Sequence, residues 1–423
     1  MNNNELLEAI EAKLNQLHPV ELLEPESMRP VAIMTRERRQ LGELEKEFLQ
    51  RLEELKSEKR VTRIITRLAN VYLSEASFGR AIVLYELTLG QDSNQVNAWI
   101  NMGLAYLLLS SPKEAISCLG SALAIDQRNT LAMVYLAKAQ LKLGELNEAN
   151  INLDRALFID SNFTRALLGK GLYFRAKGDP EVAVTWLRRA LSMDPKFLPA
   201  LMELGSVYLS LKRYEEAVDV LNQALKLDPE QAFALSTLGD VYSELHDLES
   251  ALYYFDKAVS IKFDDPELWT KKGDIHKALK SYQQASNAYQ KAINADPEYV
   301  EGWIKNGAVM LLLGDEGTAL EHLNTALALD PTNAEVSHQR GLIYYSLERY
   351  EEAFADFDAA FSNDPGNPEN LYYRALMLEL LGKKEEAKRT WTVAQRLYNE
   401  AGNIVKSAEC KTRARRLGQS HKD

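Results

Sequence analysis

One feature of the sequence constrains the fold more than any other. A 34-residue pattern repeats ten times over residues 62–401, without an insertion or a deletion. Units of this length stack on their neighbours and need no shared centre. The pattern therefore predicts one elongated array, rather than the two or three compact domains that 423 residues would otherwise suggest. Residues 1–61 and 402–423 lie outside the repeats.

Small residues recur at fixed places in each unit when its positions are numbered 1 to 34 from Thr62. Position 8 is Gly or Ala in all ten units, and position 20 is always Ala. Position 27 is Ala in nine units, with Thr88 as the exception. Larger apolar residues lie between them at helical spacing. The pattern predicts two amphipathic helices that cross closely at the small residues, because only Gly or Ala lets the two backbones approach.

Turn residues separate the predicted helices. Position 15 is glycine in four units, at Gly144, Gly178, Gly314 and Gly382, where the first helix must turn sharply into the second. Position 31 is Asp in eight units, and Pro follows it in five. Proline removes a backbone donor and disfavours helix in the residue before it, so an Asp-Pro step ends the second helix. Each unit is therefore predicted to be a helix-turn-helix hairpin.

This pattern resembles the tetratricopeptide repeat family: Trp or Leu at position 4, Gly or Ala at 8, Tyr at 11, Ala at 20, Phe, Tyr or Leu at 24, Ala at 27 and Pro at 32. The resemblance implies an all-α, right-handed α-solenoid, a superhelix of antiparallel helix hairpins. Its concave groove, lined by the first helix of each hairpin, would bind peptides or protein surfaces. The departures are mild, such as Ala69, Ala137 and Ala375 in place of Gly at position 8.

The two flanks are also predicted to be helical. Residues 1–61 contain one short amphipathic helix, which Pro19 ends, and a second helix over about residues 35–59. The apolar faces of these two helices are expected to comprise Leu6, Leu7, Ile10, Leu14 and Leu17 in the first, and Leu41, Leu44, Phe48, Leu52 and Leu55 in the second. This region is interpreted either as an N-terminal helical cap or as a pair of helices for self-association or partner docking.

The C-terminal segment, residues 402–423, is predicted to form a basic capping helix and a tail. The helix is expected over residues 403–417, with Ile404, Val405 and Ala408 facing the last repeat. Its excess of Lys and Arg has two interpretations. Basic residues stabilise the negative end of a helix dipole and keep a cap soluble, or they contact an acidic partner or nucleic acid.

Charge and cysteine content narrow the class of protein. A net charge of −11 disfavours binding of the whole chain to nucleic acid or to anionic membranes. Two cysteines, Cys118 and Cys410, cannot form a disulfide framework and fit a reduced compartment. The N-terminus is polar, and the longest apolar stretches are far shorter than the roughly 20 residues of a membrane span. We therefore expect a cytoplasmic protein without membrane insertion.

No pattern typical of catalysis, cofactor binding or metal binding is found. The six histidines are scattered, and no pair has the spacing of metal ligands. Gly169-Lys170-Gly171 lacks the full spacing of a phosphate-binding loop and falls inside a predicted helix. No Gly-x-Ser-x-Gly nucleophile motif occurs. We expect no enzyme, no cofactor and no metal.

The groove that the resemblance implies would be lined by positions 2, 5, 6, 9, 12 and 13. In the first four units these positions carry basic residues and no acid, interleaved with Asn and Tyr. The candidate partner-binding residues are Arg63, Arg67, Asn70, Asn97, Asn101, Tyr135, Lys138, Lys142, Arg165 and Arg175. The hypothesis is that this stretch binds an acidic or phosphorylated peptide, because a concave basic surface attracts anionic segments. The alternative is a solvated polar face with a chance imbalance of charge.

Later units differ in the charge of these positions. The fifth and sixth carry Glu203, Asp240 and Glu244, and the seventh and eighth mix both signs. The whole pattern favours a scaffold or adaptor that binds partner peptides or protein surfaces within a multiprotein complex. The alternative is a structural protein that self-assembles through its N-terminal helices and repeat ends. The identity of the partner, the pathway and the oligomeric state do not follow from the sequence.

Overall fold

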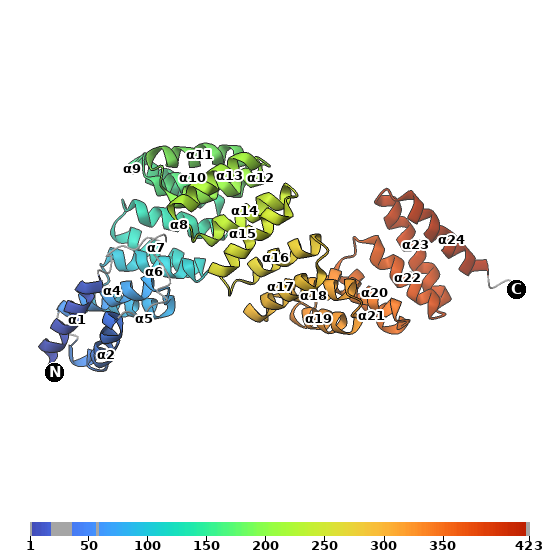
Figure 1. Cartoon of the computed structure of the whole chain (residues 1–423), viewed down its shortest axis with the longest axis horizontal. Coiled ribbons are helices and arrows are strands. Elements are labelled where there is room, and N and C mark those ends of the chain that lie inside the picture. Colours follow the sequence, from blue (N-terminus) through green and yellow to red (C-terminus); the bar gives the residue numbers. More distant parts are fainter. Residues whose placement is uncertain (1, 18–35, 56–58, 420–423) are drawn as a thin grey trace. The chain divides into compact units, whose positions relative to one another are not determined.

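The computed structural model describes residues 2–17, 36–55 and 59–419, and this part of the chain is built from α-helices without strands (Figure 1). The first helices of the ten hairpins are α4 (Lys59–Ser74), α6 (Val96–Leu108), α8 (Thr130–Lys142), α10 (Thr164–Lys177), α12 (Leu198–Ser210), α14 (Ala232–Glu244), α16 (Pro266–Ala278), α18 (Val300–Leu312), α20 (Ala334–Ser346) and α22 (Pro368–Leu380). The second helices are α5 (Phe78–Gln91), α7 (Pro112–Ile125), α9 (Leu146–Ile159), α11 (Pro180–Met193), α13 (Tyr214–Leu227), α15 (Leu248–Ile261), α17 (Tyr282–Ala295), α19 (Glu316–Leu329), α21 (Tyr350–Asn363) and α23 (Lys384–Glu400). The tandem hairpins of an all-α solenoid are thus confirmed.

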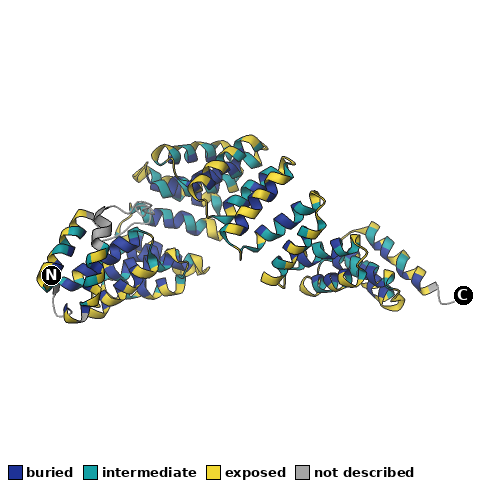
Figure 2. Ribbon diagram, turned by 60° about the horizontal axis from the view of Figure 1, so that its bottom comes forward, coloured by how far each residue is buried: buried dark blue, intermediate teal, exposed yellow. Residues whose placement is uncertain are grey.

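The chain divides into two compact units, residues 1–229 and 230–423. The first unit holds α1 to α13 and the second holds α14 to α24. In both, buried and exposed residues alternate along each helix, as expected for helices that bury one face (Figure 2).

The two helices of a hairpin cross closely at position 8. A Cβ atom on Gly205 would lie 2.5 Å from Cγ and Cδ2 of Leu221, and one on Gly273 would lie 2.5 Å from Cε1 of Tyr289. Leu221 and Tyr289 both occupy position 24 of their units, so the side chain at that position fills the space that glycine leaves open. The alanines at position 20 are fully buried beside this contact, as in Ala217.

The turn inside each hairpin has the same backbone conformation in all ten units. Position 15 has a positive φ at Gly144, Gly178, Gly314 and Gly382, as the sequence predicts. The same left-handed conformation occurs at six residues that are not glycine: Ala76, Ser110, Lys212, His246, Lys280 and Glu348. In these units the fixed hairpin geometry imposes a conformation that a side chain disfavours.

The joint between hairpins is formed by side chains as well as by the backbone. Asp194, at position 31, accepts a hydrogen bond through Oδ1 from the backbone N–H of Lys196 at 2.9 Å. Asp126 and Asp160 form the same turn. The indole Nε1 of Trp99, at position 4, donates to the carbonyl oxygen of Ser93 at 2.9 Å. These contacts give position 31 a second role, because its carboxylate closes the turn that follows the helix.

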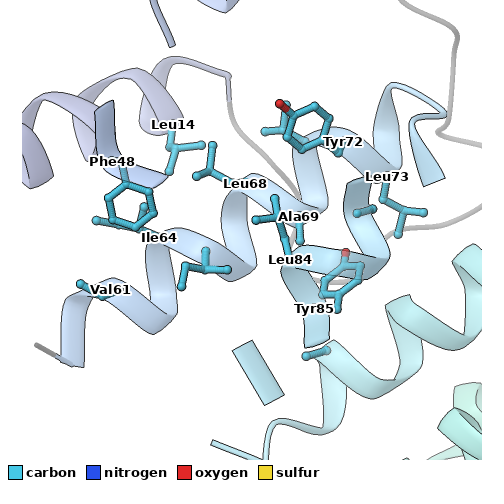
Figure 3. Packing of buried hydrophobic residues seen from close by; sticks show 14 of the residues in the cluster. Leu14, Phe48, Val61, Ile64, Leu68, Ala69, Tyr72, Leu73, Leu84 and Tyr85 are labelled. Carbon is cyan, nitrogen blue, oxygen red and sulfur yellow. The ribbon is translucent and has the colours of Figure 1, made fainter. Parts of the chain in front are cut away.

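Helices α1 (Asn3–Leu17), α2 (Arg36–Gln50) and α3 (Leu52–Leu55) precede the repeats. The second predicted helix is thus divided after Gln50. Leu14 of α1 and Phe48 of α2 are fully buried in one cluster with Ile64 and Leu68 of α4 (Figure 3). The buried set also includes Leu6, Leu7, Ile10, Leu52 and Leu55. Pro19 and the side chains of Leu17 and Leu41 lie outside the described residues.

The last helix, α24 (Ile404–Gln419), packs with a different face from the one predicted. Ile404 and Val405 are 76% and 80% exposed, and Ala408 is also exposed, so the prediction that these three face the last repeat is wrong. Cys410 is fully buried in a cluster with Trp391 and Tyr398 of α23, and Ala414 and Leu417 belong to the same cluster. The spacing of residues 407, 410, 414 and 417 makes one helical face, whereas Ile404 and Val405 lie at the exposed first turn.

Candidate peptide-binding groove

The first helices of neighbouring hairpins lie side by side in the first unit, where α4, α6, α8, α10 and α12 form a series in which each contacts the next. The ten candidate residues all belong to α4, α6, α8 and α10. The groove-position residues of these four helices are called the N-terminal groove below. The structure gathers seven of the ten candidates at two hollows, with Asn101 below the first, and places Lys142 and Arg175 elsewhere.

The first hollow lies at α4, the end of α5 and the start of α6, and has a volume of about 600 Å³. Four candidates line it: Arg63, Arg67, Asn70 and Asn97. Five residues that the sequence analysis did not single out complete the lining: Thr62, Thr66, Gln91, Asp92 and Gln95. Gln91, Asp92 and Gln95 belong to the end of the second helix and the following loop, which the family groove positions do not include. We call this hollow the Arg63 pocket.

The floor of the Arg63 pocket is a buried hydrogen-bonded group. Asn70 is 1% exposed, and its Oδ1 accepts from the Tyr85 hydroxyl at 2.7 Å and from Nδ2 of Asn101 at 3.1 Å. Asn101 is fully buried. Burial raises the pKa of Tyr85 far above its usual range, and the hydrogen bond to Asn101 opposes the shift only in part. The two amides therefore hold the floor together, while the exposed Arg63 and Asn97 face the solvent.

The second hollow, of about 50 Å³, lies between α8 and α10. Three candidates line it: Tyr135, Lys138 and Arg165. Its other walls are aliphatic, from Val134, Ala137, Leu141, Leu153, Leu168, Gly169 and Leu172. A Cβ atom on Gly169 would lie 2.4 Å from Cδ2 of Leu153, so the missing side chain of Gly169 lets Leu153 pack against this wall. We call this hollow the Leu172 pocket.

Lys142 and Arg175 are held by the protein itself. Nζ of Lys142 donates to the carbonyl oxygen of Leu107 at 3.2 Å, at the C-terminal end of α6. Nη1 of Arg175 lies 2.6 Å from Oε2 of Glu203 on α12. Burial raises the pKa of Glu203, and the positive charges of Arg175 and Lys138 oppose this shift. The basic stretch therefore ends at a carboxylate that offsets part of its charge.

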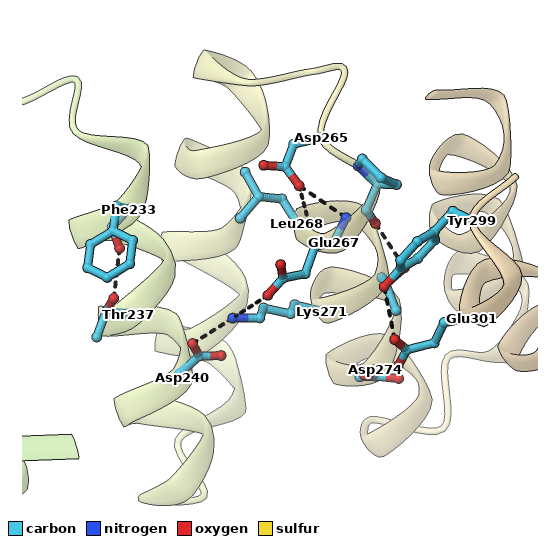
Figure 4. Close-up of polar contacts among 12 residues, drawn as sticks. Phe233, Thr237, Asp240, Asp265, Glu267, Leu268, Lys271, Asp274, Tyr299 and Glu301 are labelled. Carbon is cyan, nitrogen blue, oxygen red and sulfur yellow. Dashed lines mark hydrogen bonds and ion pairs between the residues drawn. The ribbon is translucent and has the colours of Figure 1, made fainter. Parts of the chain in front are cut away.

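The second unit carries a different pattern at the same positions. Nζ of Lys271 lies 2.8 Å from Oδ2 of Asp240 and 3.4 Å from Oε1 of Glu267 (Figure 4). Nζ of Lys305 lies 2.6 Å from Oδ2 of Asp274 and 3.1 Å from Oε1 of Glu301. We call these six residues, on α14, α16 and α18, the charge ladder. Burial would lower the pKa of both lysines, but the neighbouring carboxylates outweigh it and raise the pKa of each.

Comparison with known families identifies the repeats. Three family models, each described as tetratricopeptide repeat, match residues 198–262, residues 96–129 and 266–299, and residues 136–196 and 338–391. These segments make up more than half of the chain. The chain belongs to the tetratricopeptide repeat family. Tetratricopeptide repeats form a non-catalytic protein-interaction fold, so the family supports a protein-interaction scaffold in general.

Individual proteins similar to this tetratricopeptide repeat chain share little sequence with it. No curated protein matches it significantly. Among solved structures, Pseudomonas aeruginosa PilF is 22% identical, with coverage of 53% of this chain and 98% of that one and a TM-score of 0.44. The APC/C hetero-tetramer Cut9–Hcn1 is 15% identical, with coverages of 80% and 82% and a TM-score of 0.48. A thermophilic TPR protein of Thermus thermophilus is 24% identical, with coverages of 43% and 98% and a TM-score of 0.40. TM-scores below 0.5 show that this chain is similar to these proteins and support no further conclusion about it.

Neither a metal cluster nor a membrane span is found in the described part of this tetratricopeptide repeat chain. Within residues 2–17, 36–55 and 59–419, no three His, Cys, Asp or Glu side chains are grouped as a metal site would require. In the same residues, every helix is too short or too polar to cross a membrane.

Proposed function

We propose that this protein is an interaction scaffold or adaptor whose N-terminal groove binds an acidic or phosphorylated segment of a partner protein, within a multiprotein complex. The observation that carries the proposal is the Arg63 pocket, where two arginines, one aspartate and several amide and hydroxyl side chains line one hollow of about 600 Å³. Arginine binds carboxylate and phosphate oxygens through paired N–H groups. Asn and Gln side chains donate to and accept from the backbone of an extended peptide.

The contrast with the charge ladder supports this location. Each ladder lysine is within 3.4 Å of two carboxylates, so its charge is offset inside the protein. In the N-terminal groove, Arg63 is exposed. Among the described residues, Asp92 is the one acid in the lining of the Arg63 pocket, and Glu203 lies at the far end of the basic stretch. Within the groove, an anionic peptide would therefore meet a net positive charge at the Arg63 pocket, where two arginines outnumber one aspartate, and paired charges at the ladder.

The experiment is charge reversal in the groove. Replacing Arg63, Arg67, Lys138 and Lys142 by Glu should lower the affinity for a labelled Asp-rich peptide by at least about tenfold, because the basic groove becomes acidic and repels the peptide. Fluorescence anisotropy measures the affinity, and a pull-down tests capture of an acidic partner. The matched control replaces four exposed basic residues outside the groove, Lys113, Arg128, Lys196 and Lys226, by Glu. Equal binding by the groove variant and the wild type would contradict the proposal.

The role of the flanks is part of the same proposal. We propose residues 1–61 as a cap on the first hairpin, residues 62–401 as the ten repeats, and residues 402–423 as a capping helix with its tail. The burial of Phe48, Leu52 and Leu55 supports the cap, because self-association would need these side chains at the surface. Light scattering on the full chain tests this, since a monomer is expected.

A cytoplasmic location is supported by two buried cysteines that form no disulfide.

A further inference from the structure

The two hollows of the N-terminal groove share four repeat positions, but the following repeat completes the Arg63 pocket and the preceding repeat completes the Leu172 pocket. The Arg63 pocket uses positions 2, 5, 6 and 9 of the first repeat, and the Leu172 pocket uses the same positions of the fourth. Between them, Ile100 and Leu104 of α6 are 0% and 1% exposed. These two side chains form a closed floor, so a segment that fills both hollows crosses α6 without inserting a side chain there.

The chemistry of the two hollows differs. The Arg63 pocket is polar and open, whereas the Leu172 pocket is walled by aliphatic side chains with Lys138 and Arg165 among them. At about 10–15 Å³ for each water-sized group, its volume of about 50 Å³ holds roughly four such groups, the size of a leucine or valine side chain. Both cations are partly exposed, so an acidic residue beside the apolar one would meet opposite charge.

The separation of the hollows limits the partner sequence. The Arg63 pocket lies at α4 and α6, and the Leu172 pocket lies at α8 and α10, which is two repeats further along the groove. Packed helices lie about 8–10 Å apart, so two steps span about 20 Å. An extended peptide covers about 3.3 Å per residue, which corresponds to about six residues.

From this arrangement we infer that the partner segment has two anchors: acidic residues for the Arg63 pocket and, about six residues away, a leucine-sized aliphatic residue with an acidic neighbour for the Leu172 pocket. This inference rests on the proposed function, because it specifies the peptide that the N-terminal groove binds. The electrostatic anchor supplies long-range attraction, and the aliphatic anchor supplies selectivity by shape.

The test uses three fluorescein-labelled peptides and the full-length protein. The first has two Asp residues, a neutral spacer of about six residues, and Leu followed by Glu; each peptide is made in both chain directions. The second replaces Leu by Ser, and the third shortens the spacer to one residue. In its better direction, the first peptide should bind about tenfold more tightly than the other two, since burial of a leucine side chain is lost in both.

Variants identify the hollow that is used. Leu172→Phe fills the Leu172 pocket, so it should remove the tenfold advantage of the first peptide and leave binding of the Ser peptide unchanged. The control is Leu342→Phe, at the same repeat position in the second unit. It should leave the affinities for all three peptides unchanged. Circular dichroism checks that both variants are folded. If neither variant folds, the affinities of the wild-type protein for the three peptides still test the inference.

The outcomes separate the two proposals. Equal affinity for the Leu and Ser peptides would overturn the two-anchor inference and leave the acidic-peptide proposal intact. A tenfold advantage that survives in Leu172→Phe would overturn the assignment of the aliphatic anchor to this pocket. Failure of all three peptides to bind would overturn the proposed function together with the inference.

Discussion

The same set of positions in two different repeats shows how one fold carries two kinds of chemistry. In the first unit, Asn70 at position 9 accepts hydrogen bonds from Tyr85 at position 24 and from Asn101 at position 6 of the next repeat. In the second unit, Asp274 accepts from Tyr289 at 2.7 Å and from Lys305 at 2.6 Å, at the same three positions. The geometry is shared, but one version is neutral and the other is an ion pair.

Burial distinguishes the two versions. Asn101 is fully buried, whereas the Lys305 side chain is 28% and that of Asp274 is 40% exposed. A neutral amide can be buried once its hydrogen bonds are made, but a charge needs either a partner or water. The repeat thus fixes which positions meet, while the residues at those positions decide whether the groove is neutral, paired or open to a charged partner.

The largest expected effect comes from placing a charge at Asn101, in the buried and neutral set of Asn70, Tyr85 and Asn101. Asn101→Lys should destabilise α4 and α6 by about 3 kcal/mol or more, because its ammonium would be buried without a carboxylate. Adding Asn70→Asp should recover part of this loss by recreating the Asp274–Lys305 pair. Hydrogen exchange of the two helices measures the local stability. If the double variant is no more stable than the single one, the two sets of positions are not equivalent.

The close helix crossings of the two units differ in how much room they leave for an added methyl group. Gly205→Ala should lower stability by about 1–3 kcal/mol, because the new Cβ would lie 2.5 Å from Leu221. In Gly307→Ala the new Cβ would lie 3.3 Å from Leu323. The gain of up to about 1 kcal/mol in helix propensity should therefore offset the cost of this tight contact. Thermal melts followed by circular dichroism measure both. Equal melting temperatures for the two variants would show that Leu221 moves aside without cost.

The hairpin turns offer a matched pair across the units. Lys212 and Glu348 have φ values of 59° and 57°, which favour glycine. Lys212→Gly and Glu348→Gly should each raise stability by about 1 kcal/mol, because the strain of a Cβ in the left-handed region is removed. Denaturation midpoints report the change. Gly178→Ala, at φ 89°, is the opposite control and should lower the midpoint.

The smallest effect concerns Glu203 at the end of the basic stretch. Since burial raises the pKa of this carboxyl, lowering the pH protonates it earlier than an exposed Glu and leaves the groove more positive. Binding of the Asp-rich peptide should therefore be tighter at pH 5.5 than at pH 7.5, since exposed Asp (pKa about 3.9) remains ionised at both. Glu203→Gln should raise the affinity for the Asp-rich peptide about threefold at pH 7.5. The affinity of this variant for the peptide should not vary with pH. Titrations by fluorescence anisotropy at both pH values decide this, and equal pH dependence in the variant would exclude Glu203 as the cause.

Much of the fold was predictable because the repeat is a local pattern. The hairpins follow from helical spacing and from small residues at fixed positions, and four turns follow from glycine. The other six turns were not predictable from glycine, because Lys212 and its counterparts adopt the same φ under the constraint of the packed helices. The face of α24 was mistaken because Ile404 and Val405 are apolar but belong to an exposed first turn.

The candidate site was predictable in its position and less so in its detail. Family groove positions located Arg63, Arg67 and Lys138. They could not show that Asn101 is buried beneath the Arg63 pocket, or that Gln91 and Asp92 line this pocket. These facts depend on which side chains meet across neighbouring repeats. Hydrogen bonding between Asn70 and Asn101 spans 31 residues, and no local pattern in either repeat reveals it.

By itself, the sequence determined the number, length and register of the repeats, because stacked hairpins tolerate only certain residue sizes at their crossings. It also determined the sign of the charge along each first helix. Only the tertiary structure decided which of those charges are offset: Lys271 and Lys305 by two carboxylates each, Arg175 by Glu203, and Lys142 by a helix end. Charge is a property of a residue, whereas its neutralisation depends on the distance to an opposite charge, which packing sets.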